Sequence, residues 1–150
     1  MKRLISFCLI ITLLFTLVSC GADPDPYSLM SEFLRAYGAE GTIYSPKISE
    51  GEAGYIPNGL IEKIYRFSGE FPEDYAIYLN SRPDAGSECG LFICQDADML
   101  SSMEQACLER IRLLDRKCER SFVKVKGKTI FYSTMSDKEL AEKLWKEIIK

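Results

Sequence analysis

The chain has 150 residues, of which 47% are hydrophobic and 27% are charged, a composition typical of one folded domain. It contains no histidine. This excludes a nucleophile paired with an imidazole base, an imidazole metal ligand, and the one side chain that ordinarily titrates near neutral pH. The formal net charge is −3, but acidic residues dominate positions 20–109 and basic residues dominate positions 110–150.

The first residues have the pattern of a bacterial export signal. Lys2 and Arg3 precede an almost entirely apolar run over 4–18, which has the length of a secretory hydrophobic region and is short for a bilayer-spanning helix. The run ends in Leu17-Val18-Ser19-Cys20-Gly21, which resembles the bacterial lipobox, a motif whose cysteine is acylated and becomes the new N-terminus. A plain membrane-spanning anchor and a signal cleaved elsewhere are the alternatives.

We therefore predict a lipoprotein signal peptide at 1–19, a lipid on Cys20 and a polar, proline-containing tether over 20–27. Two acyl chains on this cysteine give the stable membrane anchoring that one chain cannot. The expected location is the extracytoplasmic face of the cell membrane, with the membrane as a partner through the lipid on Cys20.

Residues 28–150 are predicted to form a single α+β domain. Apolar residues recur at helical spacing over 28–37, and Gly38 follows as a C-cap. Glycine and proline are frequent over 39–57, which indicates a loop with one short extended piece near 42–44. A brief helix is expected from Asn58 onward.

The second half of the domain repeats one order of elements, two strands followed by a helix. Runs typical of strands at 75–79 and 89–94 precede a helical stripe that extends from Asp98 to Cys118. A second hairpin over 122–133 precedes a helix that opens with Ser136-Asp-Lys-Glu139, a capping box. The sequence therefore predicts an antiparallel four-stranded sheet (ββα-ββα) with helices packed on one face, preceded by a short N-terminal helix.

The polarity patterns of two predicted strands indicate where they lie in the sheet. The 89–94 run is apolar at nearly every residue, which fits a central strand covered on both sides, with the N-terminal helix on the second face. Lys124 and Lys126 alternate with valines, which fits an edge strand with one solvated face.

This order of elements, with Glu88-Cys-Gly-Leu-Phe92 entering a strand and Lys126-Gly-Lys-Thr-Ile-Phe-Tyr132 in a hairpin, resembles a Firmicutes family of lipoproteins carrying a C-terminal domain of unknown function. The resemblance covers roughly residues 60–149. It implies export and an α+β fold, and it carries over no activity. The chain departs from the family pattern in its cysteine content and in lacking a longer Tyr-Leu-Pro-containing connection after the long helix.

Beyond Cys20, the mature chain has four cysteines, Cys89, Cys94, Cys107 and Cys118. The last two lie about 16 Å apart by the rise of one predicted helix, and the first two point to opposite faces of one strand, so neither pair can form a disulfide. We interpret all four as buried free thiols that do no chemistry. One strand-to-helix disulfide and a redox or metal-binding role are the alternatives. The CxxC spacing of a zinc site is missing, and no metal or cofactor is expected.

Glu88 is the carboxylate that we single out, because it enters an apolar strand. A carboxylate hydrolase would need two acids that converge, and the other candidates are Glu70, Glu73, Asp74, Asp84, Asp96 and Asp98. Helix capping explains the last two more simply. The tyrosines that could line a ligand surface are Tyr44, Tyr55, Tyr65, Tyr75 and Tyr78, although aromatic residues at such positions are usually core.

Basic residues are concentrated over 110–128, at Arg110, Arg112, Arg116, Lys117, Arg120, Lys124, Lys126 and Lys128. The predicted location and the overall acidity exclude a nucleic-acid partner. Ordinary solvated faces are one interpretation of this segment, and a surface that faces anionic lipid is the other.

The sequence favours a noncatalytic envelope lipoprotein that binds another envelope protein or a small ligand. The absence of histidine and of a nucleophile motif supports this class over the alternative, an extracytoplasmic enzyme that uses carboxylates or a thiol. An exposed aromatic patch would support the first class, and a concave pocket with converging ionisable groups would support the second.

Overall fold

A computed structural model of the chain describes residues 25–81 and 87–149. The predicted signal peptide at 1–19, Cys20, most of the predicted tether and Asp84 lie outside this described part. In chain order the described elements are α2 (Pro26–Tyr37), β1 (Gly41–Tyr44), α3 (Asn58–Tyr65), β2 (Asp74–Asn80), β3 (Glu88–Ile93), α4 (Ala97–Leu114), β4 (Phe122–Lys126), β5 (Thr129–Ser133) and α5 (Lys138–Ile148).

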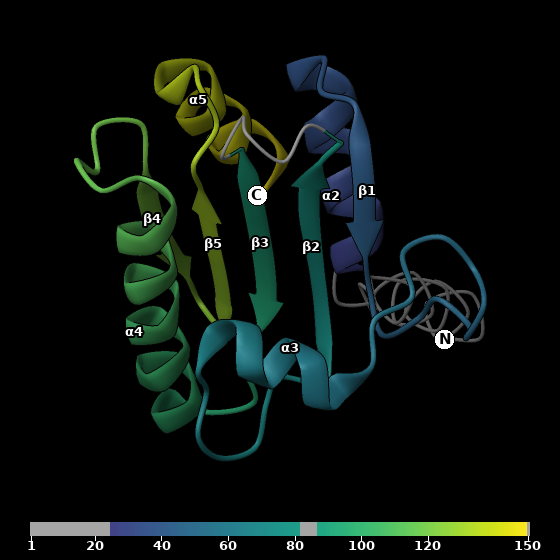
Figure 1. The fold of residues 1–150 in the computed structure, drawn as a ribbon. Coiled ribbons are helices and arrows are strands. Elements are labelled where there is room, and N and C mark those ends of the chain that lie inside the picture. The colour runs from purple at the N-terminus through teal and green to yellow at the C-terminus, as the bar shows by residue number, and fades with distance from the viewer. Residues whose placement is uncertain (1–24, 82–86, 150) are drawn as a thin grey trace, which may run out of the picture.

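The strands form one antiparallel sheet in the order β1-β2-β3-β5-β4 (Figure 1). Both predicted hairpins are present, with Tyr75 opposite Phe92 in the first and Val123 opposite Tyr132 in the second. Strand β5 also pairs with β3, which places β3 at the centre of the sheet and β4 at one edge. The predicted antiparallel α+β architecture is confirmed.

The described sheet has five strands rather than the four predicted, because β1 joins it at the other edge. Thr42 of β1 lies opposite Leu79 of β2 in an antiparallel ladder. The short extended piece expected near 42–44 is therefore an edge strand of the sheet. Its four residues are too few to show an alternating pattern, and its pairing depends on a strand more than thirty positions later in the chain.

Helices cover both faces of the sheet (Figure 1): the N-terminal helix α2 lies on the second face as predicted, but the prediction that the two later helices, α4 and α5, share one face is wrong. Helices α3 and α4 pack on one face, where Met103 of α4 contacts the cluster around Phe92 and Tyr132. Helices α2 and α5 pack on the other face, where Trp145 stacks on Phe131 with ring centroids 4.9 Å apart. Strands β2, β3 and β5 are apolar on both sides, and each side needs a cover.

Helix α4 ends at Leu114, four residues before its predicted end. The carboxylate of Asp115 accepts hydrogen bonds from the backbone N–H of Arg120 at 2.9 Å and the hydroxyl of Ser121 at 2.8 Å, which closes a turn in place of further helix. Cys118 lies in this turn with a φ of 53° and is exposed. The prediction that Cys118 belongs to the buried helical stripe is wrong.

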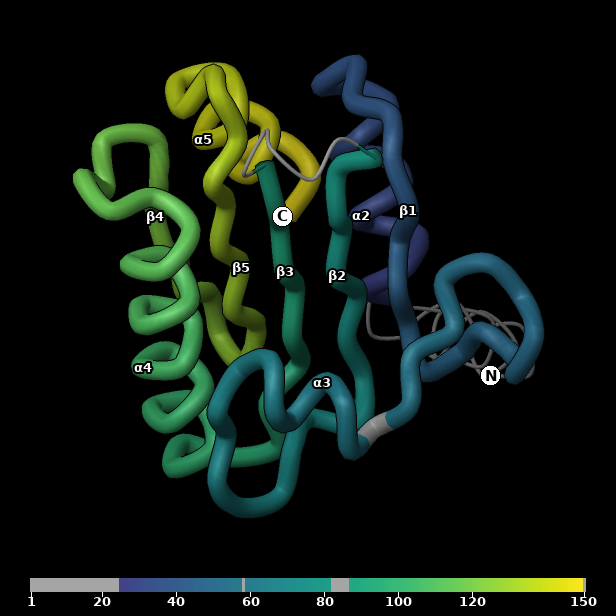
Figure 2. Tube along the Cα trace, viewed as in Figure 1, coloured from purple at the N-terminus to yellow at the C-terminus, as the bar shows by residue number. Residues whose placement is uncertain are grey.

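Lys47 ties together three segments that are far apart in the sequence. Its ammonium lies 2.6 Å from the carboxylate of Asp25, the N-cap of α2, and 3.4 Å from that of Asp74, the first residue of β2. The hydrogen bond from Lys47 is the main reason that the pKa of Asp25 is lowered to about 2. Figure 2 follows the loop between β1 and α3, which contains Lys47 and extends beyond the β1 edge of the sheet. This ion-pair cluster fixes the loop beside the start of β2.

Candidate functional site

Glu88, the carboxylate singled out from the sequence, lies at the start of β3 and is only 3% exposed. Arg110 of α4 binds it with two hydrogen bonds, from Nε at 2.8 Å and from Nη2 at 2.6 Å. The hydroxyl of Tyr132 donates to the same carboxylate, and the hydroxyl of Tyr65 hydrogen-bonds to that of Tyr132. These four side chains form a continuous polar network inside the core beneath α4, which we call the Glu88 network.

Local sequence explains how the Glu88 network is positioned. Arg110 lies three residues after buried Cys107 and one residue before buried Ile111, so it belongs to the inner side of α4. Tyr132 lies opposite Gly90 across the β3–β5 ladder, and a Cβ at position 90 would stand 2.3 Å from its ring. A glycine at position 90 therefore gives the Tyr132 ring the room to cross β3 toward Glu88.

The Glu88 network satisfies its own charges. The hydrogen bond to Glu88 raises the pKa of Arg110, so the guanidinium stays charged across the accessible pH range. Burial raises the pKa values of Tyr65 and Tyr132 well above the ordinary tyrosine value, so both hydroxyls stay protonated. A bidentate pair that is buried and hydrogen-bonded in this way orders the core, and its carboxylate is not presented to a substrate in solvent.

All four described cysteines are free thiols, and three of them are buried. Cys89 and Cys94 belong to the clusters on opposite faces of the sheet, as predicted. Burial raises the pKa of Cys89 to about 12 and that of Cys94 to about 11, and it raises the pKa of Cys107 well above the ordinary thiol value. A thiolate is the nucleophilic form, so these three thiols are chemically quiet.

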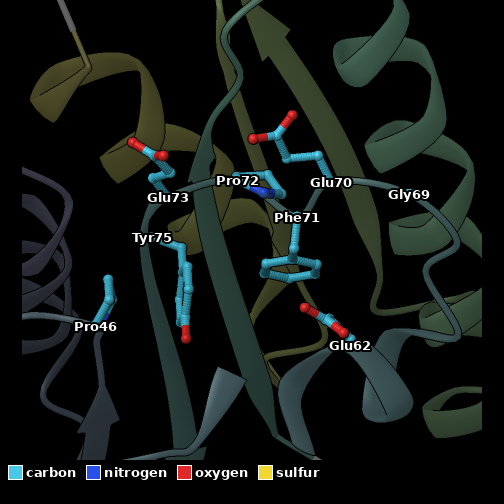
Figure 3. A pocket seen from close by; sticks show the side chains of 8 residues that line it. All are labelled: Pro46, Glu62, Gly69, Glu70, Phe71, Pro72, Glu73 and Tyr75. Atoms are coloured by element: carbon cyan, nitrogen blue, oxygen red, sulfur yellow. The ribbon is translucent and has the colours of Figure 1, made fainter. Parts of the chain in front are cut away.

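A pocket opens where the chain passes from α3 into β2. Its volume is about 260 Å³, and it is lined by Pro46, Glu62, Gly69, Glu70, Phe71, Pro72, Glu73 and Tyr75 (Figure 3). We call this the acidic pocket, because three of its eight lining residues are glutamates. Glu62 is half-buried on α3, whereas Glu70 and Glu73 are exposed on the segment that leads into β2.

Aromatic packing fixes the wall of the acidic pocket. The ring of Phe71 meets that of Tyr75 edge-on, with centroids 5.4 Å apart. Phe71 also packs against Phe67, Phe92 and Tyr65 at centroid distances of 5.4–6.0 Å. Because Phe71 is held on several sides by other rings, the pocket wall is preformed rather than dependent on a ligand.

The hydroxyl of Tyr75 is a buried polar group without a hydrogen-bond partner among the described residues. Tyr75 is 1% exposed and lines the acidic pocket, and burial, reinforced by the charge of Glu62, raises its pKa to about 12. In Figure 3 the Tyr75 hydroxyl and the Glu62 carboxylate are both drawn below the level of the Phe71 ring, the hydroxyl to its left and the carboxylate beneath it. Unpartnered buried hydroxyls are costly and rare, so this one is a polar group of the pocket lining that the described residues leave unsatisfied.

The carboxylates of the acidic pocket have no ion-pair partner in the part of the chain that the structure describes. None of Glu62, Glu70 and Glu73 forms an ion pair within residues 25–81 and 87–149, and neighbouring Lys47 is bound to Asp25 and Asp74. In Figure 3 the carboxylates of Glu70 and Glu73 point away from that of Glu62. The pocket is therefore negatively charged, and its acids do not converge on one point.

The remaining acidic candidates have structural partners. Asp74 pairs with Lys47, and the carboxylate of Asp96 accepts a hydrogen bond from the backbone N–H of Met99 at 2.8 Å as the N-cap of α4. Asp98 lies in the first turn of α4, where an acidic side chain favours the helix dipole. Helix capping was the simpler interpretation of the 96–98 pair, and the structure agrees with it.

The tyrosine candidates separate in the structure. Tyr75 lines the acidic pocket, Tyr65 belongs to the Glu88 network, and the Tyr78 hydroxyl donates to the backbone carbonyl of Glu40 at 2.9 Å. Tyr44 is half-buried at the end of β1, and Tyr55 is 37% exposed in the following loop. The structure does not bring them together as one aromatic surface.

Half of the basic residues over 110–128 have partners inside the protein. Arg110 binds Glu88, and Lys124 lies 3.6 Å from the carboxylate of Glu142. Lys126 and Lys128 donate to the backbone carbonyls of Ile149 and Gln95 at 2.9 and 2.7 Å. These contacts favour the interpretation as ordinary solvated faces with local partners.

Sequence reasoning missed Glu62, Phe71 and the inward role of Arg110. Glu62 lies between buried Ile61 and buried Tyr65 on α3, so its position at the boundary of the apolar face was the available signal. Phe71 lies between two acidic residues just before a strand, a pattern that indicates an apolar anchor in a charged segment.

In the part of the chain that the structure describes, no cluster of acidic and cysteine side chains is arranged to hold a metal ion. Every described helix is too short or too polar to cross a bilayer. Comparison of the chain with protein-family models, curated proteins and solved structures finds no match.

Proposed function

We propose that the protein is an exported lipoprotein, anchored through Cys20 to the extracytoplasmic face of the cell membrane, that binds a ligand in the acidic pocket without catalysing a reaction. The observation that carries the proposal is the preformed pocket of about 260 Å³, in which unpaired carboxylates surround an aromatic wall and an unpartnered buried hydroxyl. Concave, mostly rigid sites with few polar groups are typical of small-ligand binding.

Binding is favoured over the alternative, an enzyme that uses carboxylates or a thiol. A carboxylate hydrolase requires two acids on either side of one bond, whereas Glu70 and Glu73 point away from Glu62 in Figure 3. The buried thiols of Cys89, Cys94 and Cys107 have raised pKa values, which disfavours nucleophilic attack. The arrangement of the acidic pocket therefore supports recognition better than turnover.

The proposed anchor and the acidic pocket are compatible in space. Asp25, the first described residue, is tied through Lys47 to Asp74, which follows the pocket residue Glu73. The chain from Cys20 to Asp25 reaches roughly 17 Å when fully extended. A lipid on Cys20 would hold the pocket end of the domain close to the bilayer, and a ligand would be captured near the membrane surface.

Two experiments test this proposal. For the anchor, Cys20→Ala is compared with the unchanged protein by cell fractionation and fatty-acid labelling. We expect loss of the label and release from the lipid-modified pool; membrane retention with an unchanged label would contradict the anchor.

For the pocket, mixtures of anionic, neutral and cationic small molecules are added to the full-length protein in nonionic detergent, and backbone amide shifts are recorded by NMR. We expect at least one mixture to shift residues 62 and 69–75. Shifts confined to other regions in every mixture would contradict a binding site in the acidic pocket.

A further inference from the structure

We infer that the acidic pocket binds a primary ammonium group at the end of an alkyl chain, the chemistry shared by a free amine and a lysine side chain. This inference rests on the proposed binding function and names the ligand class of the same site. It is carried by the juxtaposition of the Glu62 carboxylate, the unpartnered Tyr75 hydroxyl and the Phe71 ring in one concavity.

The charge of the acidic pocket selects a cation. Three glutamates line it, and none of them forms an ion pair within the described residues. Lys47, next to the lining residue Pro46, is engaged by Asp25 and Asp74 and so does not neutralise the pocket. An anionic ligand would meet uncompensated repulsion at this site, whereas a cation would gain attraction in a partly desolvated setting.

The Tyr75 hydroxyl selects a cation that donates hydrogen bonds. A primary ammonium has three donors. Glu62 and Tyr75 line the same pocket, so a primary ammonium ligand finds there an acceptor in the carboxylate and a second acceptor in the hydroxyl oxygen. Burial raises the pKa of the Tyr75 hydroxyl, and the charge of Glu62 adds to this effect. A quaternary ammonium has no donor and would leave the hydroxyl unsatisfied.

The aromatic wall and the small volume select the rest of the ligand. The ring of Phe71 lines the pocket and gives a nearby cation a favourable field, and the exposed Pro46 offers apolar surface to an alkyl chain. A volume of about 260 Å³ lies just below the range of sites for drug-sized molecules, so the pocket accommodates one short chain. A metal ion fits poorly, because the described acids form no coordinating group.

The test uses four probes of similar length, at constant ionic strength, with the full-length protein in nonionic detergent. Pentylamine and N-acetyl-lysine methylamide carry the primary ammonium as a free amine and as a lysine side chain. Pentyltrimethylammonium keeps the charge without a donor, and N-acetyl-norleucine methylamide keeps the chain without the charge. Backbone amide shifts report the position of binding and the dissociation constant.

We expect at least one primary ammonium probe to shift residues 62 and 69–75, with both control probes weaker by about tenfold or more, the value of a charge-assisted hydrogen bond. Preference for pentylamine would indicate a free amine, and preference for the lysine derivative would indicate a protein or peptide partner.

Three variants assign the effect to named atoms. Glu62→Gln should weaken binding of the better ammonium probe about tenfold or more, because it removes the charge and keeps the shape. Tyr75→Phe should weaken binding a few-fold, since it removes one neutral hydrogen bond. Glu32→Gln, which removes the same charge from an exposed position on α2, is the matched control and should leave binding unchanged.

The outcomes separate the inference from the proposed function. If the norleucine probe binds the pocket as tightly as the lysine probe and Glu62→Gln has no effect, the pocket binds ligands but the ammonium assignment is wrong. If the quaternary probe binds as tightly as pentylamine, the role given to Tyr75 is wrong. If neither ammonium probe shifts pocket residues at 50 mM while other compounds do, the inference fails and the proposed function stands. If no compound of any charge shifts them, both fail.

Discussion

Glu88, at the start of β3, and Glu62, on α3, are carboxylates of the same protein with opposite surroundings. Glu88 is 3% exposed and receives two hydrogen bonds from Arg110 and one from Tyr132. Glu62 lines an open pocket, forms no ion pair within the described residues, and shares this pocket with Tyr75, whose hydroxyl also has no partner among those residues. The carboxylate of Glu88 is bound by side chains inside the protein, whereas the carboxylate of Glu62 lines a pocket and has no such partner among the described residues.

This difference separates structural from functional charge. A buried charge is tolerated in the folded state only while all of its internal partners are present. Removing one partner leaves the remaining charge buried without compensation, which lowers the free energy of unfolding. A charge that lacks an internal partner contributes little to the fold and is free to recognise a ligand. The predictions below test whether the two groups behave in these two ways.

The largest effect is expected from Arg110→Met, which removes the cation and leaves the Glu88 carboxylate buried. The free energy of unfolding should fall by about 3 kcal/mol or more, because breaking a buried pair strands the remaining charge. Urea unfolding followed by the fluorescence of Trp145, the single tryptophan, measures it. Arg112→Met, at an exposed position of the same helix, should change stability by about 0.5 kcal/mol or less. An equal loss of stability in the two variants would show that the buried pair of Arg110 and Glu88 is no more important for the fold than an exposed arginine.

A smaller effect is expected from the two tyrosine hydroxyls. Tyr132→Phe removes a donor to Glu88 and a partner of Tyr65, and should cost about 1–3 kcal/mol. Tyr75→Phe removes a hydroxyl that has no partner among the described residues, and should be neutral or stabilising by up to about 1 kcal/mol. The same unfolding measurement compares both variants. A loss for Tyr75→Phe as large as that for Tyr132→Phe would show that the Tyr75 hydroxyl is structural.

The smallest effects are expected at the cysteines, which separate into an exposed thiol and buried thiols. Cys118 should react quickly with a small maleimide in the native protein, whereas Cys89 and Cys107 should react only in denaturant, because burial raises their pKa values. Cys107→Ala should cost about 1 kcal/mol through a small cavity, and Cys118→Ala should cost less. Mass spectrometry of the labelled peptides identifies each site. Fast native labelling of Cys107 would contradict its burial.

Local patterns in the sequence predicted the parts of the fold that depend on near neighbours. The two hairpins and the helices that follow them were predicted from a change of period at Asp98 and from the turn around Gly127. The start of α4 also follows from one side chain, because Asp96 caps it. These signals lie within a few residues of the element that they specify.

The features of the fold that the sequence did not reveal depend on contacts between residues far apart in the chain. Strand β1 exists because Thr42 pairs with Leu79, and the faces chosen by α4 and α5 depend on which side of the sheet each helix returns to. Helix α4 ends early because Asp115 bonds to the backbone of Arg120, a competition that the helical stripe through Cys118 does not reveal.

The candidate site shows the same limit. Glu88 was singled out from the sequence, but Arg110 was grouped with solvated basic residues although its spacing from Cys107 places it on the inner face of α4. Glu62 and Tyr75 come from separate elements, and their position in one pocket follows from the packing of α3 against the start of β2.

The most direct test of the central claim is the urea midpoint of the unchanged protein, Glu88→Gln and Glu62→Gln, each with and without 20 mM of the primary ammonium probe that binds more tightly, pentylamine or N-acetyl-lysine methylamide. A ligand that binds the folded state raises the urea midpoint by mass action. Ionic strength is matched with sodium chloride, so that a general effect of salt on stability is not mistaken for binding. We predict that Glu88→Gln lowers the midpoint but still responds to the probe. Glu62→Gln should keep the midpoint and lose the response. A Glu62→Gln protein that responds fully, or a Glu88→Gln protein as stable as the unchanged one, would contradict the division between structural and ligand-facing charge.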